Sequence, residues 1–323
     1  MAMTDPITIV QIEQAAARLQ GVAHMTPVVA NRRLDEVARA RVFLKCENFQ
    51  RVGAFKFRGA YNAVSRLAAS GDSRPIVTIS SGNHAQGVAL ACRLQGRVAH
   101  VVMPAPVNVA KRAAVLGYGA ALYEAPNRPE AERLARDLVL RHDAVLVHPY
   151  NDPDVMAGQG TVALEFLSQV PNLDVLLAPV SGGGLMSGLC VAAHARKADI
   201  CLYACEPAGA LDAMVSVREN RIVPVVHPHT IADGLRATLG DLALPILRQH
   251  LSGFFVVQEQ EIIDAMRFVF ERIKVVIEPS SAVAIAPLLR AEGCLRDRTV
   301  GVILTGGNAD LSVFWDSLSA SLH

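Results

Sequence analysis

The stretch that decides the fold is residues 43–60, FLKCENFQRVGAFKFRGA, in which Lys56 stands between Phe55 and Phe57. A short apolar segment and a polar turn with Gly53 precede this lysine, and small residues follow it. Lysine is rare in protein interiors, so this amine either extends its charged end to solvent or occupies an apolar pocket. In such a pocket the pKa of the amine falls, and the neutral amine can attack a carbonyl group. Taken alone, Lys56 is better explained as a structural residue than as a nucleophile.

Length and composition indicate a globular protein without an electrostatic signature for nucleic acid. The chain has 323 residues, which suits two domains or one large α/β unit. It is 51% hydrophobic and 19% charged, with a net charge of +1, so we expect it to bind neither nucleic acid nor a membrane surface. The six cysteines form no Cys-x-x-Cys pair, and we interpret them as reduced thiols. The first residues do not have the pattern of a signal peptide, so we expect a cytoplasmic protein.

Strand and helix patterns alternate regularly from residue 75 onward. The first series predicts strands over 76–79, 98–103, 121–124 and 145–147, and helices over 84–94, 107–116 and 129–141. The second series predicts strands over 175–180, 200–205, 254–257 and 300–304, and helices over 155–170, 185–196, 211–219, 259–273 and 280–290. Such alternation is typical of right-handed crossovers between parallel strands. We therefore predict a two-domain α/β protein, in which a large parallel-sheet domain (1–74 and 149–323) contains a smaller inserted α/β domain (75–148).

The glycine run that follows the predicted strand 175–180 is the strongest candidate for a phosphate site. Its sequence, SGGGL over residues 181–185, has three consecutive glycines, which let the backbone wrap closely around an anion. The helix that follows would add unpaired N–H groups and the positive end of its dipole. The run has neither the Lys-Ser/Thr ending of a nucleotide P-loop nor the spacing of a dinucleotide fingerprint. We favour a phosphate site over a tight turn, because one glycine would suffice for a turn.

Three further loops carry polar groups at strand-to-helix junctions. Residues 80–84, SSGNH, could bind a carboxylate, although on this loop alone we favour ordinary helix capping by Ser81 or Asn83. Thr305 follows the last strand and could meet a ring nitrogen or cap a turn. Glu206 and Asp212 could share a hard cation, although charges at a helix N-terminus are the simpler explanation. Together, a pocketed lysine, a phosphate loop, a carboxylate loop and a hydroxyl loop are the parts of a pyridoxal-phosphate site.

The joint pattern resembles the serine/threonine dehydratase and serine racemase family of pyridoxal-phosphate enzymes, whose fold (fold type II) is that of the tryptophan synthase β subunit. The matching segments run in the family's order from residue 45 to residue 308. They are KCENFQ (45–50), GAFKFRGA (53–60), SSGNHAQG (80–87), AGQG (157–160), PVSGGG (179–184), EP (206–207), ADG (232–234), EPS (278–280) and LTGGN (304–308). The resemblance therefore covers most of the chain.

This resemblance implies a role for each candidate residue. Lys56 would carry pyridoxal phosphate as a Schiff base, with Phe55 packed beside the ring. Asn83 would bond the phenolic oxygen of the cofactor, and Thr305 would face its pyridine nitrogen. The residues that would hold the phosphate are Ser181, Gly182, Gly183, Gly184 and Leu185. The residues that would bind the substrate carboxylate are Ser80, Ser81, Gly82, Asn83 and His84. The ligands of a Mg²⁺ or Ca²⁺ site would be Glu206, the carbonyl of Ala210, and Asp212.

The activity that the resemblance implies is dehydration of L-threonine, L-serine or a related β-hydroxy amino acid to the 2-oxo acid and ammonia. The amine of Lys56 would remove the α-proton. A serine racemase with dehydratase side activity fits the same motifs if Ser81 acts on the face opposite Lys56. So does a dehydratase specific for 3-hydroxyaspartate or phenylserine. A ligand-binding protein without catalysis would need the glycine run but not Lys56, which counts against it. We expect a small amino-acid substrate and a homodimer.

Overall fold

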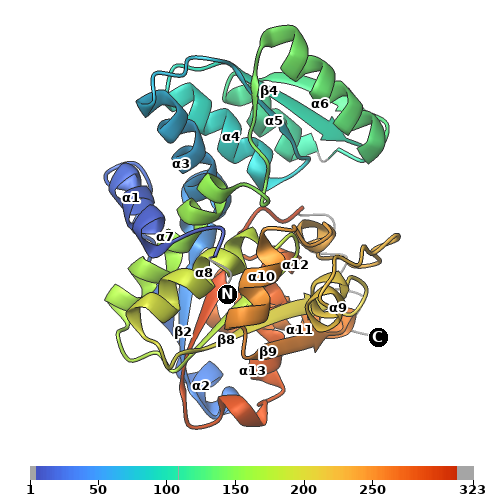
Figure 1. Ribbon diagram of the computed structural model, residues 1–323. Helices are drawn as coiled ribbons and strands as arrows, with labels where there is room; N and C mark the ends of the chain where they lie inside the picture. The colour runs from blue at the N-terminus through green and yellow to red at the C-terminus, as the bar shows by residue number, and fades with distance from the viewer. Residues whose placement is uncertain (1–4, 108, 311–323) are drawn as a thin grey trace.

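Two β-sheets organise the protein, which is described here by a computed structural model of residues 5–107 and 109–310 (Figure 1). The larger sheet has the order β1-β2-β10-β7-β8-β9, formed by Val28–Ala30, Arg41–Cys46, Thr299–Leu304, Val175–Pro179, Cys201–Pro207 and Gly253–Val257. The smaller sheet has the order β5-β4-β3-β6, formed by Ala121–Ala125, Ala99–Pro104, Ile76–Ile79 and Val145–Leu146. Neighbouring strands are parallel, except that β1 is antiparallel to β2. The predicted parallel α/β fold is confirmed.

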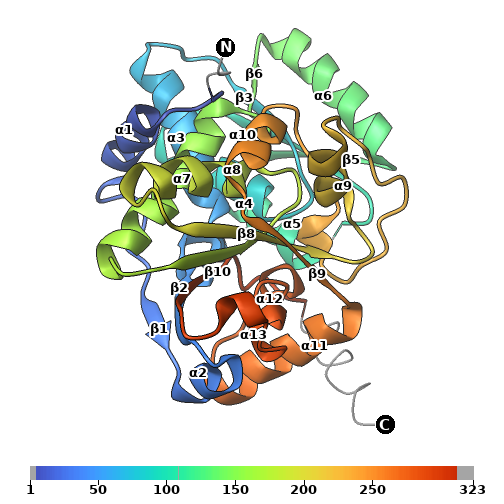
Figure 2. The same ribbon diagram turned by 60° about the horizontal axis from the view of Figure 1, so that its bottom comes forward.

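Helices cover both faces of the larger sheet (Figure 2). One face packs against α1 (Ile9–Leu19), α7 (Pro153–Gln169), α8 (Gly184–Arg196) and α10 (Ala243–His250). The other face packs against α2 (Arg32–Ala38), α11 (Glu259–Phe268), α12 (Pro279–Ala282) and α13 (Ala286–Leu289). In β7, Val175 and Leu177 enter the second core while Leu176 and Ala178 enter the first, because successive side chains of a strand point to opposite faces. Burial on both faces explains the continuous apolar run of this strand.

The smaller sheet is also covered on both faces. Helices α3 (Lys56–Ala69), α4 (Asn83–Leu94) and α5 (Val109–Gly117) pack on one face, and α6 (Arg128–His142) packs on the other. In the chain α3 precedes residue 75, yet its Phe57 and Ala60 belong to the same core as Ile76. Because α3 lies outside residues 75–148 and yet packs on the smaller sheet, the domain boundaries at residues 75 and 148 remain a prediction. No helix among the described residues is long and apolar enough to cross a membrane.

The structure differs from the predicted elements at several helices: α2, α3 and α10 were not predicted, and two predicted helices are divided. No helix was expected over residues 56–69, where Gly59 disfavours a helix locally; in the structure this glycine lets α3 lie close to α7. A Cβ at Gly158 of α7 would be 2.6 Å from the Cα of Gly59. The predicted helix 280–290 is instead the two short helices α12 and α13. Pro287 lies in the first turn of α13, where its missing N–H is tolerated, whereas inside one continuous helix it would break the bonding.

The remaining elements are short. They are α9 (Asp212–Glu219), the 3-10 turns η1 (Glu47–Phe49), η2 (Arg51–Gly53), η3 (Asp233–Leu235) and η5 (Gly293–Leu295), and the π-helical turn η4 (Val269–Ile273). The predicted helix 259–273 is therefore α11 followed by η4, in which the hydrogen bonds reach one residue further. The strands β2, β7, β8 and β10 are parallel, so their carboxyl ends lie on one side of the larger sheet, and the segments that follow them contain Lys56, residues 181–185, Asp212 and Thr305.

A buried group of charges joins β2, α3 and α7. The guanidinium of Arg58 makes two hydrogen bonds to Glu47, of 2.8 and 2.7 Å, and lies 3.0 Å from a carboxylate oxygen of Glu165. Lys45, on β2, is fully buried and pairs with the same Glu165. Burial alone would raise the pKa of Glu47, but Arg58 outweighs this effect, and the pKa of Glu47 lies below its usual value. The positive charges of Lys45 and Arg58 are thus balanced by the negative charges of Glu47 and Glu165.

Removing one acidic partner is expected to leave Arg58 charged and incompletely paired in the interior. Glu47→Gln should therefore lower the free energy of unfolding by about 3–5 kcal/mol, measured by urea denaturation. Glu36→Gln is the matched control, because Glu36 forms exposed pairs with Arg32 and Arg33, and such pairs contribute at most about 1 kcal/mol. Equal denaturation midpoints for the two variants would show that the buried group does not stabilise the fold.

Candidate active site

Lys56 is the first residue of α3, and the residue is partly buried. The Nζ atom donates a hydrogen bond of 2.8 Å to the carbonyl of Pro149 and lies 5.2 Å from the ring centroid of Phe55. Burial lowers the pKa of Lys56 to about 8, and the carboxylate of Glu278 opposes part of this shift. The neutral form, which attacks carbonyl carbons, is therefore far more abundant near physiological pH than in an exposed lysine. The ring of Phe57 points the other way, into the core of the smaller sheet.

The segment before Lys56 is held against the loop that follows β10. The amide of Phe55 donates to the carbonyl of Thr305 at 3.0 Å, and the amide of Gly307 donates to the carbonyl of Gly53 at 3.0 Å. Gly53 has a φ of +70°, and a Cβ there would lie 2.6 Å from Asn308, so this turn requires glycine. The pairing places buried Thr305 close to the lysine segment.

The glycine run forms the junction between β7 and α8. Gly183 has a φ of +85°, and a Cβ there would be 2.5 Å from the Cβ of Ala243. A Cβ at Gly182 would overlap the ring of Tyr150. The helix starts at Gly184 without a side-chain cap, so its first N–H groups have no partner within the helix. Such a loop can enclose a phosphate group.

The two remaining members of the predicted phosphate loop serve the fold as well. The hydroxyl of Ser181 accepts a hydrogen bond from the amide of Ala237 and donates one to its carbonyl, both at 3.1 Å. Leu185 is buried in the core on one face of the larger sheet. For both residues, the backbone N–H is the group that could bind a phosphate oxygen.

Pro149 and Tyr150 connect the lysine to the glycine run. The carbonyl of Pro149 accepts the hydrogen bond of Lys56, and the next residue packs on the glycines: a Cβ at Gly184 would lie 2.8 Å from the carbonyl oxygen of Tyr150. The amine and the glycine run therefore lie on two sides of one dipeptide. This is the arrangement that a cofactor with an aldehyde at one end and a phosphate at the other requires.

Asn83 belongs to the predicted carboxylate loop and bonds directly to two residues of the larger sheet's loops. Its Nδ2 atom lies 2.9 and 3.0 Å from the two carboxylate oxygens of Glu278, and its Oδ1 accepts a hydrogen bond of 2.8 Å from Asn308. Asn83 starts α4 of the smaller sheet, whereas Glu278 precedes α12 and Asn308 follows β10. The site thus includes residues from both sheets.

The rest of the carboxylate loop is divided between the site and the core. The hydroxyl of Ser80 accepts a hydrogen bond from the amide of Gly82 at 3.2 Å. Ser81 is partly exposed, and its hydroxyl has no hydrogen-bond partner among the described residues. The ring of His84 is buried, with Nε2 at 3.4 Å from the carbonyl of Val147. Burial and the charge of Lys56 hold the pKa of His84 well below its usual range, so this imidazole is neutral.

Glu206, near the end of β8, and Asp212, the first residue of α9, are both buried, with buried Ala210 in the turn between them. The oxygens of Glu206 accept hydrogen bonds from the amides of Ala213 and Met214, and Asp212 accepts one from Leu239. Burial raises the pKa of Glu206 to about 8 and that of Asp212 to about 6. Neither carboxylate has an ion-pair partner in the described part of the chain, which also contains no cluster of three or more His, Cys, Asp or Glu residues suited to a metal.

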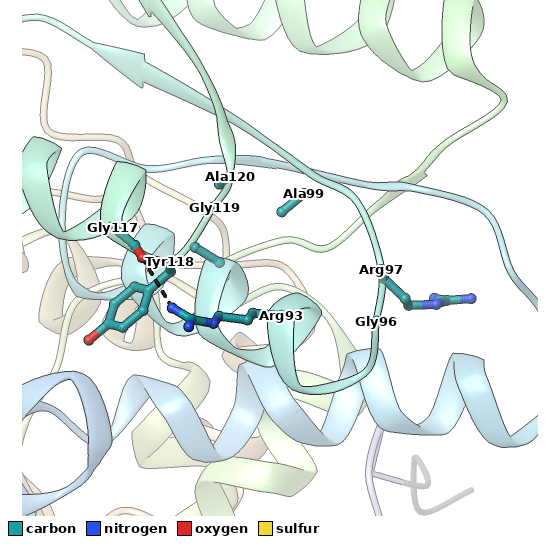
Figure 3. Close-up of a pocket in the computed structure, with 9 residues that line it drawn as sticks. Arg93, Gly96, Arg97, Ala99, Gly117, Tyr118, Gly119 and Ala120 are labelled. Carbon is teal, nitrogen blue, oxygen red and sulfur yellow. Dashed lines mark hydrogen bonds between the residues drawn. The ribbon is translucent and has the colours of Figure 1, made fainter.

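Of two cavities in the structure, one adjoins the predicted site residues and the other does not. One of about 650 Å³ adjoins the site, and its lining includes Lys111, Asp233, Pro279 and Asn308. The second, of about 500 Å³, lies at the end of α4 and contains none of the predicted residues (Figure 3). There Arg93 donates a hydrogen bond of 3.2 Å to the carbonyl of Gly117. The position of the second cavity excludes it as part of the lysine site.

Three residues that help build the site were not predicted from the sequence. Glu278 and Asn308 occur in the matched motifs but received no role, because a single Glu or Asn in a loop has no spacing signal of its own. Tyr150 carries no such signal, since only the folded chain places its ring on the glycines. The clue that could have found the first two is that EPS and LTGGN match motifs of the family that the sequence resembles.

Comparison with known proteins agrees with this geometry. A family model described as "Pyridoxal-phosphate dependent enzyme" matches residues 19–306. The chain is 40% identical to a serine racemase of Arabidopsis thaliana over 319 residues, which cover 97% of this chain and 96% of the relative. It is 42% identical to an L-threo-3-hydroxyaspartate ammonia-lyase of a Pseudomonas species over 303 residues, which cover 93% and 95%. The solved structure of maize serine racemase superposes with a TM-score of 0.92 at 39% identity, covering 98% of each chain.

The match to the family model spans most of the chain, and both relatives are similar over nearly their whole length. The partly buried lysine, the uncapped glycine run and the Thr305 loop follow β2, β7 and β10, whose carboxyl ends lie on one side of the larger sheet, and they fit such a cofactor. The chain belongs to the fold type II family of pyridoxal-phosphate dependent enzymes that contains the serine racemases and the 3-hydroxyaspartate ammonia-lyases.

Proposed function

We propose that the protein is an ammonia-lyase that converts a β-hydroxy amino acid, such as L-serine, L-threonine or 3-hydroxyaspartate, to the 2-oxo acid and ammonia. The observation that carries this proposal is the position of the partly buried amine of Lys56. It donates a hydrogen bond to the carbonyl of Pro149, and the next residue, Tyr150, packs on the glycine run. The similarity to an L-threo-3-hydroxyaspartate ammonia-lyase supports it. The wider class includes phenylserine as a bulkier substrate.

Each part of the site has a separate task in this reaction. Bound pyridoxal phosphate withdraws electrons from the bonds at the α-carbon of the amino acid. The N–H groups of residues 181–185 would bind its phosphate, Asn83 would contact its phenolic oxygen, and Phe55 would pack beside its ring. Lys56 would attach the cofactor and, once displaced by the substrate, would accept the α-proton at Nζ.

Thr305 and the loop 80–84 would direct the reaction toward loss of the β-hydroxyl. The hydroxyl of Thr305 would be a neutral hydrogen-bond partner for the ring nitrogen, whereas a carboxylate would hold a full proton there. The ring would then withdraw electrons less strongly. This would favour loss of the β-hydroxyl over a prolonged negative charge at the α-carbon. The loop and the start of α4 offer N–H groups and a positive dipole end to the substrate carboxylate.

Serine racemisation is the second candidate function, and Ser81 is the observation that favours it. The hydroxyl of Ser81 is partly exposed and has no partner among the described residues, so it is free to give and take a proton. Racemisation needs such a group on the face of the α-carbon opposite Lys56. The Arabidopsis and maize relatives are named serine racemases.

Lys56→Ala is expected to abolish both cofactor attachment and activity, because the amine that bonds the aldehyde is removed. The measurement is the visible absorption of the purified protein after incubation with pyridoxal phosphate, followed by a 2-oxo-acid assay. Lys197→Ala is the matched control, since Lys197 lies 3.5 Å from Asp174, away from the site. An active, coloured Lys56→Ala protein would refute the proposal.

The substrate class is tested by release of 2-oxo acid from L- and D-serine, L-threonine, both 3-hydroxyaspartate diastereomers and phenylserine. We expect release from at least one L-β-hydroxy amino acid, and chiral chromatography of L-serine reactions measures any D-serine. Ser81→Ala is expected to remove D-serine formation while retaining 2-oxo-acid release, because only racemisation uses the second face. If both activities of Ser81→Ala equal those of the wild type, Ser81 has no role in proton transfer.

We further expect Mg²⁺ or Ca²⁺ to bind at Glu206, the Ala210 carbonyl and Asp212, since two neighbouring buried carboxylates without a cationic partner among the described residues suit an oxygen-binding ion. Either ion should raise the melting temperature, measured by calorimetry against a chelator-treated sample. Glu206→Gln should abolish this increase. Glu219→Gln, at the far end of α9, should retain it. No increase with the wild type would exclude the site.

A further inference from the structure

Glu278 is a buried carboxylate at the centre of the site, and it has no task in the proposed reaction. Only 4% of the residue is exposed. It precedes α12, and its amide donates to the carbonyl of Gly306 at 3.0 Å. A Cβ at Gly306 would lie 2.5 Å from a carboxylate oxygen of Glu278. The glycine thus leaves the space that this carboxylate occupies.

A continuous chain of hydrogen bonds runs from Glu278 to the segment before Lys56. Asn83 Nδ2 donates to the carboxylate of Glu278, and Asn308 Nδ2 donates to Asn83 Oδ1 at 2.8 Å. Asn308 Nδ2 also donates to the carbonyl of Val52 at 2.7 Å. An ionised carboxylate can only accept hydrogen bonds, and this fixes which end of the Asn83 amide faces it.

Charged groups of three neighbouring elements surround Glu278. They are Asp233 of η3, Lys111 of α5 and Lys56 of α3. On α11, the carboxylate of Glu259 is bonded instead to the amide of Ile231 at 2.8 Å. Burial raises the pKa of Glu278 to about 7, with a further contribution from Asp233, while Lys111 and the Asn83 hydrogen bond oppose the shift. The carboxyl group therefore changes its charge within the physiological range.

We propose that Glu278 is a positioning residue for Asn83: the ionised carboxylate holds the Nδ2 end of the Asn83 amide, and protonation of the carboxylate releases or reverses that amide. One N–H of Asn83 binds Glu278 in the ionised state, and the second is left for another acceptor. If Asn83 contacts the phenolic oxygen of the cofactor, as the proposed function holds, that acceptor is the phenolic oxygen. Glu278 would then couple the solution pH to the charge of the cofactor ring.

The first experiment uses the full-length protein without cofactor, so that it does not depend on the proposed function. The side-chain amide signals of Asn83, identified by their absence in Asn83→Ala, are followed by ¹H–¹⁵N NMR from about pH 6 to about pH 9. We expect them to shift with a midpoint of about 7 in the wild type. The shift should be lost in Glu278→Gln and retained in Glu259→Gln. Signals that do not move, or that move equally in Glu278→Gln, would overturn the proposal.

The second experiment uses the enzyme loaded with pyridoxal phosphate. Its visible absorption is expected to show a pH transition that Glu278→Gln lacks and Glu259→Gln retains, at equal cofactor content. The same transition in Glu278→Gln would also overturn the proposal. A wild type that never binds the cofactor, yet shows the NMR shift of Asn83, would refute the proposed function and support the role of Glu278. Asn83 signals of the wild type that do not move with pH would overturn the proposal even if Glu278→Gln does not fold.

Discussion

The register of β2, β10 and β7 is the constraint on which the site depends. These strands are neighbours and run parallel, although β10 comes last in the chain. Their carboxyl ends therefore bring the lysine segment, the Thr305 loop and the glycine run to one edge of the sheet. A slip of one residue would turn each strand's side chains to the opposite face. Because both faces of this sheet are buried, such a slip would place those side chains in the wrong core, and the register is strongly specified.

The buried charges of this protein fall into two kinds with different consequences. Arg58 pairs with Glu47 and Glu165, which raise its pKa despite burial, so its charge remains in the interior and fixes α3 to the sheet. Lys45 also pairs with Glu165, although burial still lowers the pKa of Lys45. The amine of Lys56, two residues before Arg58, is bonded to a carbonyl, which attracts its charge only weakly. Its pKa falls because the carboxylate of Glu278 offsets only part of the effect of burial. The paired charge of Arg58 holds α3 in place, and the incompletely compensated amine of Lys56 is the reactive group.

The parts of the site could be predicted from the sequence better than their connections. The alternation of strands and helices predicted both parallel sheets, and buried β7 was evident from its apolar run. Helix α3 was not predictable, since Gly59 disfavours a helix locally and α3 forms where it packs on α4 and α7. Nor could the positions of Tyr150 and Glu278 be predicted, because their contacts join segments distant in sequence. The direction of the Ser181 hydroxyl, toward Ala237, likewise depends on a loop far along the chain.

The central place of β10 has a consequence for how the protein is made. During synthesis, β2 and β7 leave the ribosome with the strand that separates them still missing, so both present unpaired edges. Pairing such distant segments is slow, and exposed edges favour association between chains. The small sheet, whose strands are contiguous in sequence, can close early. The larger sheet can close only when β10 has been made, and until that moment the edges of β2 and β7 remain open to association with other chains.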